Sequence, residues 1–437
     1  MHSNHLLKFL FLSLCFTLLS CSNNKSTKGN QKIVIQAVKG KYSILKNGKI
    51  FNIKGASGYS NFAELKKSGG NAVRIWDTTH VDQILKEANE NDISVIVGLP
   101  IPESQYLSYY NDNAEVAADL KKLKSLVNRL KSNPALLMWC VGNELVFPNK
   151  PSYHNFYKSF NTIVDMIHSD DPDHPVTTTM VNFQKNDIVN IKIRTNVDII
   201  SFNIFSRITE FEEDLKNFSW FWDGPYLITE WGIDGPWKGH SRTAWDAKIE
   251  PTSTAKAKAY LSRYKRYMPI NDPRFLGSFI FFWGQKQEIT HTWYSLFDEF
   301  GNKTESVSSA EEIWSGKAVN FKGPKVSDIL LNNKVALDNI FLDPKKLQTA
   351  QIKVLGDTSD LKVEWKIYPE DWFKKNNVNN LIRPNALKGL MRSQSGFSIK
   401  FISPNTEGPY RLFSTIFDNK GNIATANIPF YVINNEE

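Results

Sequence analysis

Two glutamates occupy equivalent places in the sequence, each at the end of an apolar stretch. Glu144 closes the run that begins at Leu136, and Glu230 closes the run that begins at Leu227. Apolar runs of this length predict buried β-strands, and a strand that stops at a carboxylate presents that group at the rim of its sheet. Two carboxylates, one protonated and one ionised, are the groups that cleave a glycosidic bond. This chemistry requires both glutamates to lie close together at the same edge of the folded sheet.

Strands alternate with helices through the region that contains the two glutamates. The predicted strands are 51–56, 71–76, 94–100, 136–144, 176–182, 197–205, 225–232 and 277–284, and the predicted helices are 62–68, 81–91, 114–131, 153–168, 210–217, 254–267 and 308–314. Near-continuous apolar strands indicate a parallel sheet that is covered on both faces. The pattern predicts an α/β fold, a (β/α)8 TIM barrel, in which Glu144 and Glu230 close strands four and seven at a shared mouth.

These residues resemble the signature of a known enzyme clan. Asn143-Glu144 at strand four and Glu230 at strand seven are similar to the motifs of the clan A glycoside hydrolases, TIM barrels related to families 2 and 5. The resemblance covers residues 40–317 and implies a retaining mechanism, with Glu144 as acid/base and Glu230 as nucleophile. It also implies that Asn143 binds the 2-hydroxyl of the sugar, a contact that strengthens toward the transition state.

Two further residues match this clan. Arg74 matches the arginine that ends the second strand, and a cation there would keep Glu230 ionised. Trp283, at the end of strand eight, matches the aromatic floor beneath the reacting sugar. We therefore expect both residues at the substrate site.

The sixth strand departs from the clan pattern. Many clan members place a tyrosine there, with its hydroxyl against the nucleophile, but this chain has Phe205. Either a tyrosine from another loop, such as Tyr59 or Tyr294, replaces it, or Glu230 is tuned differently. Asn203 is the polar side chain that this strand delivers to the mouth.

The loops after strands seven and eight are rich in aromatic and amide side chains, which suit hydroxyl-rich sugar rings. Few arginines accompany them, and this favours a neutral β-glucan over a sulfated or uronic acid substrate. His240 and His291 are expected to face solvent or to contact hydroxyl groups. The candidate substrate-binding residues of these loops are Trp231, Trp237, Gln287 and Trp293.

Composition limits the other possible partners. The 437 residues carry a formal charge of +8, but the basic residues are dispersed, so we expect no nucleic acid partner. Histidine and acidic residues lack metal-ligand spacing, so neither a metal nor another cofactor is expected. Cys140 lies in an apolar strand and is interpreted as a buried thiol rather than a nucleophile. We expect a monomer.

The first residues predict export and lipidation. Lys8 precedes the apolar run Phe9 to Leu19, and Leu18-Leu19-Ser20-Cys21 resembles the bacterial lipobox. We expect residues 1–20 to be a lipoprotein signal peptide, Cys21 to be acylated, and residues 21–35 to be a flexible tether. The protein would then be lipid-anchored at the cell envelope, on the outer membrane, the surface or the periplasmic face.

The remaining chain divides into two domains. Asn47-Gly48 predicts a hairpin turn ahead of the barrel, which spans residues 36–320, and the hairpin is expected to plug it from below. Beyond residue 325, apolar residues recur at every second position, which is the spacing of β-strands. This predicts an immunoglobulin-like β-sandwich over 325–437, which we expect to serve as a spacer. This two-domain plan resembles the endo-β-1,3-glucanases of glycoside hydrolase family 158.

The sequence thus predicts a retaining β-glycosidase with a poly- or oligosaccharide substrate. One alternative is a transglycosylase with the same two glutamates, in which a sugar rather than water resolves the intermediate. An alternative of another class is a non-catalytic glycan-binding lipoprotein, although both glutamates are present.

Overall fold

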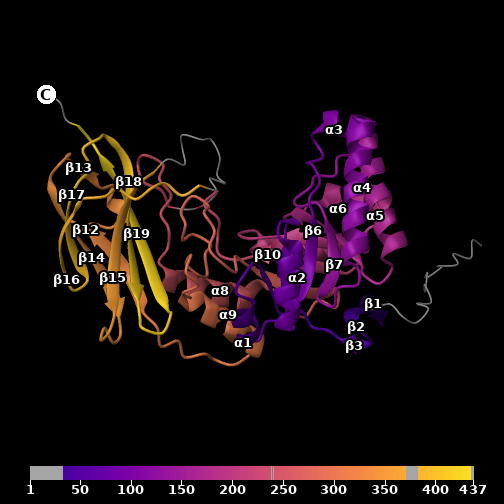
Figure 1. Ribbon diagram of the computed structural model, residues 1–437, viewed down its shortest axis with the longest axis horizontal. Helices are drawn as coiled ribbons and strands as arrows, with labels where there is room; N and C mark the ends of the chain where they lie inside the picture. The colour runs from indigo at the N-terminus through magenta and orange to yellow at the C-terminus, as the bar shows by residue number, and fades with distance from the viewer. Residues whose placement is uncertain (1–32, 238, 240, 371–381, 435–437) are drawn as a thin grey trace, which may run out of the picture.

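The computed structural model describes residues 33–237, 239, 241–370 and 382–434 and consists of two bodies side by side (Figure 1). An α/β barrel forms the larger body, and an all-β sandwich forms the smaller one. The predicted signal peptide, Cys21 and His240 lie outside the described residues. Within the described ranges, no helix combines the length and the apolar character needed to cross a membrane.

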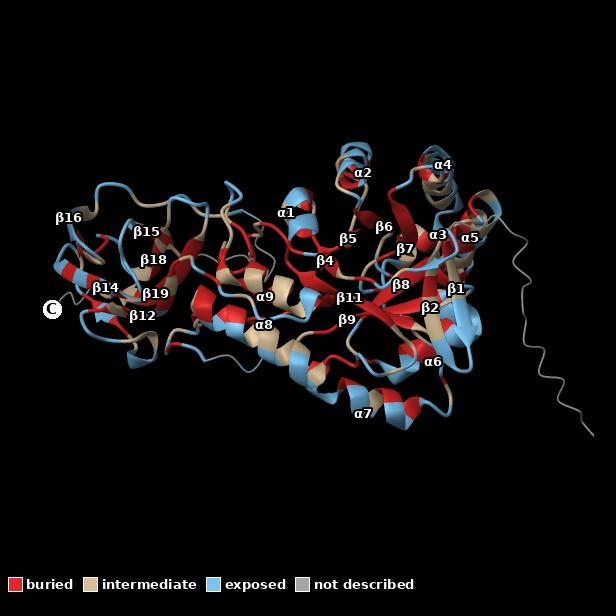
Figure 2. Cartoon of the chain, turned by 90° about the horizontal axis from the view of Figure 1, so that it is seen from below, coloured by how far each residue is buried: buried red, intermediate tan, exposed pale blue. Residues whose placement is uncertain are grey.

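The predicted TIM barrel is confirmed. Eight parallel strands close in the order β10-β11-β4-β5-β6-β7-β8-β9, so each strand pairs with its sequence neighbours and the last pairs with the first. Their bounds are β4 Gly55–Ser57, β5 Ala72–Ile75, β6 Ser94–Leu99, β7 Leu136–Val141, β8 Val176–Val181, β9 Ile199–Asn203, β10 Tyr226–Trp231 and β11 Phe275–Phe281. Most of these residues are buried, as the colouring of Figure 2 shows. Helices cover the outside of such a barrel, and side chains pack inside it.

Helices surround the barrel. They are α1 Phe62–Lys67, α2 Val81–Glu90, α3 Leu107–Asn111, α4 Asn113–Leu130, α5 His154–Asp170, α6 Lys185–Arg194, α7 Ile208–Phe218, α8 Ser253–Tyr267 and α9 Glu305–Ser315, with a 3₁₀ turn at Pro151–Tyr153. The predicted helices did not include α3 or α6. In α6, Ile191 and Ile193 alternate with polar residues, which is a strand-like period, but Ile188 and Ile191 have helical spacing and are buried, whereas Ile193 is exposed.

A small antiparallel sheet closes the lower end of the barrel, as expected for a plug. It contains β1 Ile33–Val38, β2 Lys41–Lys46 and β3 Lys49–Ile50, with the Asn47-Gly48 turn between the last two. Ile33 and Ile44 pack with buried residues from the bottom of the barrel. Because β1 begins at Ile33, residues 33–35 belong to this sheet and not to the expected tether.

The smaller body is the predicted β-sandwich. One sheet has the order β12-β14-β17-β16, and the other has the order β13-β19-β18-β15. The strands are β12 Lys325–Leu331, β13 Phe341–Leu342, β14 Leu347–Leu355, β15 Lys362–Pro369, β16 Met391–Ser395, β17 Ser398–Ile402, β18 Gly408–Phe417 and β19 Ile423–Val432, with a 3₁₀ turn at Ala336–Asp338. Alternate residues of both sheets form a second apolar core, separate from that of the barrel.

Candidate active site

Glu230 lies at the mouth of the barrel, where one of its oxygens accepts three hydrogen bonds. Arg74 Nη1 and Trp76 Nε1 each lie 2.6 Å from Oε1, and Asn203 Nδ2 lies 2.7 Å from it. The other oxygen, Oε2, accepts no hydrogen bond from the described residues. The carboxylate is therefore fixed in orientation through Oε1, and Oε2 is left available for reaction.

Asn203 joins the two glutamates. Its Nδ2 donates to Glu230 Oε1 and also lies 2.9 Å from Glu144 Oε1. Thr229 Oγ1 holds the other end of the amide by donating to Asn203 Oδ1 at 2.9 Å. Since one nitrogen touches both carboxylates, these two oxygens cannot be farther apart than the sum of the two distances. That separation lies below the ~6.5 Å at which inverting pairs begin and suits the ~5 Å spacing of retaining pairs.

The end of β7 turns sharply and so brings Glu144 to the mouth. Gly142 has φ +73°, and Glu144 itself has φ +55°, a left-handed conformation that is uncommon for a side-chain residue. The positive φ of Gly142 favours glycine, and a Cβ there would also lie 2.4 Å from Leu145 Cδ1, so that this side chain would have to move. Asn143, between them, accepts a hydrogen bond from Arg74 Nη2 at 2.5 Å.

The electrostatics of Glu230 differ from the expectation. Burial raises the pKa of Glu230 to about 8, with Arg74 opposing this rise and the Glu144 carboxylate adding to it. Arg74 thus acts in the predicted direction, toward the ionised form, but it does not by itself keep Glu230 ionised. The physical reason is that complete burial removes water from the carboxylate, and the Arg74 guanidinium, which is shared with Asn143, does not compensate fully.

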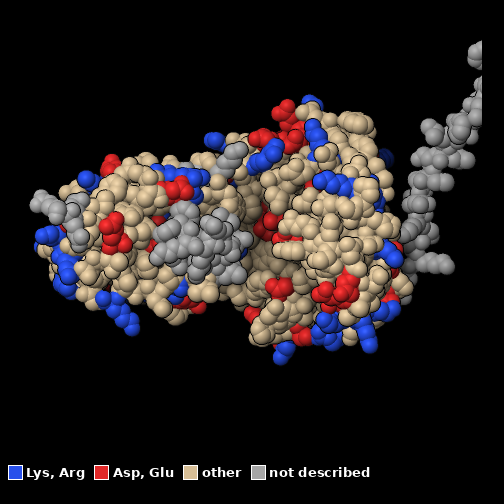
Figure 3. All heavy atoms as spheres, turned by 90° about the horizontal axis from the view of Figure 1, so that it is seen from above, with Lys and Arg blue, Asp and Glu red and all other residues tan. Residues whose placement is uncertain are grey.

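A cleft of ≈ 650 Å³ opens over the two glutamates, a volume suited to a small ligand. Carboxylate and amide groups form its floor, and aromatic rings form its walls. Figure 3 shows the surface hollowed between the two bodies, with acidic atoms inside the hollow. The wall residues are Tyr59, Trp76, Val181, Asn182, Phe205, Ser206, Trp237, Phe281, Phe282, Lys286 and Glu288.

Of the predicted residues, Asn143, Glu144, Asn203, Glu230 and Trp237 line the cleft, and Arg74 lies directly behind Glu230. Three of the predicted tryptophans, Trp231, Trp283 and Trp293, do not line it. Trp283 is completely buried against Phe297 and Trp314, on the helix side of the barrel wall. Phe281 and Phe282 face the sugar site in its place.

Trp231 was predicted to bind substrate, but its side chain does not line the cleft. It packs against Tyr260 and Tyr264 of α8 and is 1% exposed. Successive residues of a strand point to opposite faces, so the inward position of Glu230 sends Trp231 outward. This alternation was available from the sequence and would have excluded Trp231.

The loop after β11 presents different residues from those predicted. Trp293 is buried and donates from Nε1 to Asp234 O at 3.1 Å, and Gln287 donates to Ile289 O at 3.3 Å; neither lines the cleft. Lys286 and Glu288, the two neighbours of Gln287, do line it, and their side chains pair at 2.8 Å. The sequence offered no regular period in this loop from which to choose between adjacent residues.

His291 was expected to face solvent or substrate hydroxyls, and this is wrong. Its ring stacks on Phe413 of the sandwich with 4.5 Å between centroids, and burial lowers its pKa to about 4. The side of the loop opposite Lys286 and Glu288 is therefore a domain contact.

Neither Tyr59 nor Tyr294 donates the hydrogen bond to Glu230 that the missing strand-six tyrosine would supply. Tyr59 donates to Asp77 Oδ2 at 2.7 Å, and the buried hydroxyl of Tyr294 has no hydrogen-bond partner among the described residues. The indole N–H of Trp76, at the end of strand two, donates to Glu230. Its ring also lies over Arg74, with 4.5 Å from the guanidinium carbon to the ring centroid.

The barrel is similar to domains of known proteins. Residues 76–268 match the family model described as glycosyl hydrolases family 2, TIM barrel domain. A segment of 122 residues is 30% identical to β-glucuronidase of Rattus norvegicus; it makes up 27% of this chain and 17% of that protein.

Two solved structures share the fold. A β-glucuronidase of Bacteroides uniformis, covalently bound to cyclophellitol-6-carboxylate aziridine, aligns with TM-score 0.51 and 11% identity over 92% of this chain and 48% of its own. A Bifidobacterium dentium β-glucuronidase complexed with coumarin-3-O-glucuronide aligns with TM-score 0.51 and 15% identity. The alignment covers 65% of this chain and 49% of that structure's chain. The chain thus spans about half the length of each of these structures.

Fold and site together define a glycosidase-type barrel with paired carboxylates on its fourth and seventh strands. Together with the family model, which matches residues 76–268, they support a clan A glycoside hydrolase domain related to family 2.

Proposed function

We propose that the protein is a retaining β-glycoside hydrolase that cleaves a neutral β-glucan by double displacement. The observation that carries this proposal is the single amide nitrogen of Asn203, which touches both Glu144 and Glu230 and so sets their spacing. Spacing of this kind leaves no room for a water molecule between sugar and base, but allows one carboxylate to attack the anomeric carbon.

The reaction divides between the two glutamates. In the first step Glu144 gives its proton to the glycosidic oxygen while Glu230 Oε2 attacks C1, so the C1–oxygen bond breaks and a glycosyl ester forms. In the second step the Glu144 carboxylate takes a proton from water as the water oxygen attacks C1 and displaces Glu230. Two inversions at C1 retain its configuration.

Arg74, Trp76 and Asn203 act on the charge of the nucleophile. Their three hydrogen bonds to Glu230 Oε1 favour the ionised form, which must be present for attack and is regenerated when the ester is cleaved. Arg74 also donates a hydrogen bond to Asn143, which in this proposal binds the 2-hydroxyl of the sugar.

The charge of the cleft supports a neutral substrate. Its described lining carries three carboxylates, Glu144, Glu230 and Glu288, and one ammonium, that of Lys286. The one ammonium among the described lining residues, that of Lys286, is already paired with Glu288, so a uronic acid carboxylate would find no unpaired cation there and would lie close to further carboxyl groups. Aromatic walls and hydroxyl-binding amides suit uncharged hexose rings.

A second hollow supports action within a polymer. It adjoins the cleft across Tyr59, which lines both, and measures ≈ 380 Å³. Asp77, Gln83 and Glu87 supply polar groups in it, and Ile84 supplies an apolar contact. A groove that continues past the reacting sugar suits an endo-acting enzyme, and resemblance of the two-domain plan to family 158 favours a β-1,3 linkage.

The experiment is digestion of β-1,3-, β-1,4- and mixed-linkage glucans, a mannan and an aryl β-glucuronide, with product lengths and anomeric configuration recorded. We expect β-1,3-glucan to give short oligosaccharides of retained configuration. Glu144→Gln and Glu230→Gln should each reduce kcat/KM by a factor on the order of 10³. Activity that survives in both variants contradicts the mechanism, and cleavage of the glucuronide alone contradicts the neutral substrate. Products lengthened by sugar acceptors would identify a transglycosylase.

We also propose that the protein is exported and anchored through an acylated Cys21, because its first residues resemble a lipoprotein signal. Membrane fractionation of the full chain and of Cys21→Ala, with labelled palmitate, tests this. Equal membrane association of the two proteins, without label in either, would contradict it.

A further inference from the structure

A buried carboxylate at the junction of the two bodies joins three parts of the molecule. Glu250, whose side chain is 1% exposed, lies just before α8. It forms an ion pair with Lys256 of α8 and accepts hydrogen bonds from Thr290 Oγ1 at 2.6 Å and Thr292 Oγ1 at 2.7 Å, both in the loop after β11. Asn427 Nδ2, from sandwich strand β19, completes the set at 2.6 Å.

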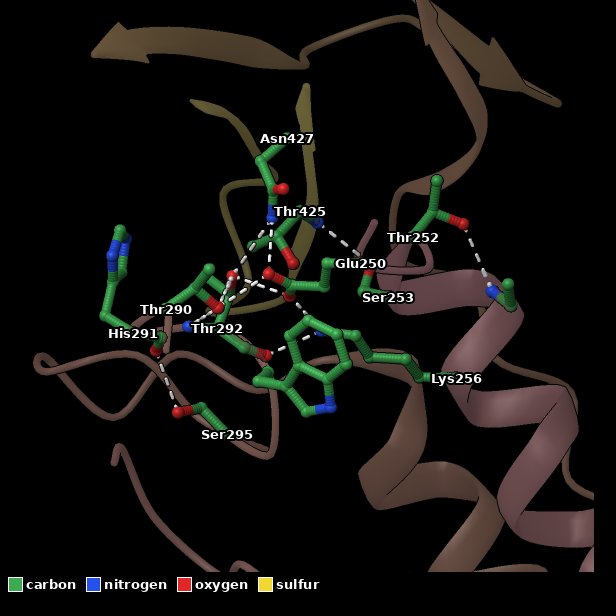
Figure 4. A network of polar contacts seen from close by, with 12 residues as sticks. Glu250, Thr252, Ser253, Lys256, Thr290, His291, Thr292, Ser295, Thr425 and Asn427 are labelled. Carbon is green, nitrogen blue, oxygen red and sulfur yellow. Dashed lines mark hydrogen bonds and ion pairs between the residues drawn. The ribbon is translucent and has the colours of Figure 1, made fainter. Parts of the chain in front are cut away.

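Figure 4 shows this arrangement, in which Asn427 reaches from the sandwich to Glu250 between the loop threonines and the helix. Lys256 Nζ also donates to Thr292 O at 2.6 Å, and Arg411 Nη1 of β18 donates to Asn427 Oδ1 at 2.7 Å. A buried carboxylate is costly unless its oxygens are satisfied, and here both are. A fully satisfied network of this kind favours one relative position of its members.

The network is connected directly to the cleft. Thr290 and Glu288 exchange two backbone hydrogen bonds, from Glu288 N to Thr290 O at 2.9 Å and from Thr290 N to Glu288 O at 2.7 Å. Glu288 in turn lines the cleft and pairs with Lys286. A continuous chain of contacts therefore runs from sandwich residue Asn427 to the substrate site.

The loop needs such support. Ile289, between Glu288 and Thr290, has φ +61°, a conformation that a β-branched residue adopts only at a cost of the order of 1–2 kcal/mol. Strained residues persist where the surrounding contacts fix them. Here the fixed contacts are those of Thr290 and Thr292 with Glu250.

We propose that Asn427 of the sandwich, acting through Glu250 and Thr290, is a positioning residue that holds Lys286 and Glu288 in the cleft. The sandwich is then part of the working active site and not the spacer that the sequence predicted. This inference rests on the proposed function for its kinetic consequence, but the position of the loop can be measured without any activity.

The test uses the full chain with Asn427→Ala and Thr290→Val, which remove one partner of Glu250 from each side. Ser253→Ala is the matched control, because Ser253 Oγ accepts a buried hydrogen bond of 2.9 Å from Thr425 N of the same strand and makes no hydrogen bond to the described residues of the loop. Hydrogen exchange of residues 285–295 should become faster in both test variants and stay as in wild type in S253A.

The kinetic readout uses the preferred glucan. We expect kcat/KM to fall about tenfold in N427A and T290V, which corresponds to loss of one charged hydrogen bond. The acid limb of the pH profile should also move, because Lys286 and Glu288 influence the pKa of Glu230. In a Glu288→Gln background the effect of N427A should shrink, since both changes act through one side chain.

The results separate the two proposals. N427A and T290V that match S253A in loop exchange and in pH profile would overturn the positioning role. A wild-type protein that cleaves no glycan would overturn the proposed function, and loop exchange alone would then decide the positioning role.

Discussion

The indole nitrogen of Trp76 lies 2.6 Å from Oε1 of Glu230, so a tryptophan on strand two donates a hydrogen bond to the residue that closes strand seven. Clan members commonly use a tyrosine from strand six for the contact with the nucleophile, and here the corresponding position is Phe205. The hydrogen bond is therefore supplied from the other side of the barrel mouth.

Trp76→Phe keeps an aromatic ring in the cleft wall but removes the N–H group. Since the lost donor stabilises the ionised nucleophile, we expect kcat to fall about tenfold to a hundredfold with a smaller change in KM, and the acid limb of kcat/KM to move to higher pH. Steady-state kinetics across pH 4–9 measure both effects. Tyr59→Phe, which loses its hydroxyl contact with Asp77 instead, is the aromatic comparison. An unchanged pH profile in W76F would show that the indole N–H does not act on Glu230.

Asn203→Ala should have a larger effect, because it removes the amide that touches both glutamates. Loss of one preorganised donor at a reacting group costs about 10²–10³ in kcat. Thr229→Val, which only releases the other end of the amide, should cost less, about threefold to tenfold. Kinetics together with thermal unfolding of both variants test this order. Equal losses in the two variants would mean that Asn203 acts through packing alone.

The sequence predicted the fold well because its signals are repetitive. Each barrel strand is an apolar run that ends near polar residues, and eight such runs reinforce one another even though α3 and α6 were overlooked. Glu144 and Glu230 followed from the same pattern, because parallel strands of a barrel end at one mouth.

Residues around the glutamates were harder to predict, for two physical reasons. Alternation on a strand decides that Glu230 faces in and Trp231 faces out, and large aromatic side chains occur on both faces of the barrel wall. Loop residues such as Gln287 have no period at all, so only the folded structure separates them from Lys286 and Glu288. The pKa of Glu230 depends on burial and on several charges at once, and no motif encodes that balance.

The two charged residues of the loop should shift the pH profile in opposite directions. Lys286 lowers the pKa of Glu230 and the Glu288 carboxylate raises it, and Lys286 has the larger effect. Lys286→Met should therefore move the acid limb of kcat/KM to higher pH, and Glu288→Gln should move it to lower pH, because attack requires ionised Glu230. The measurement is kcat/KM against pH for both variants and wild type. Shifts of the same sign would contradict the assignment of this limb to Glu230.

Stability should respond to pH through the nucleophile itself. The pKa of Glu230 is about 8 in the folded protein against 4.5 for an ordinary glutamate, so the folded state binds a proton more tightly than the unfolded state. The contribution of Glu230 to stability is fully present below pH ~4.5 and is lost as the pH rises through 8. Glu230→Gln carries no such proton. The Tm of E230Q relative to wild type should therefore increase between pH 4.5 and 8 by roughly 5 °C, and level off above that range.

Calorimetry or near-ultraviolet circular dichroism of both proteins at several pH values measures this difference. Glu213→Gln on the exposed face of α7 controls for the exchange of a carboxylate for an amide on the surface. A Tm difference between E230Q and wild type that stays constant with pH would show that Glu230 has the same proton affinity in both states. In that case burial at the barrel mouth would be fully offset by Arg74, Trp76 and Asn203, and the nucleophile would be ionised throughout the working range.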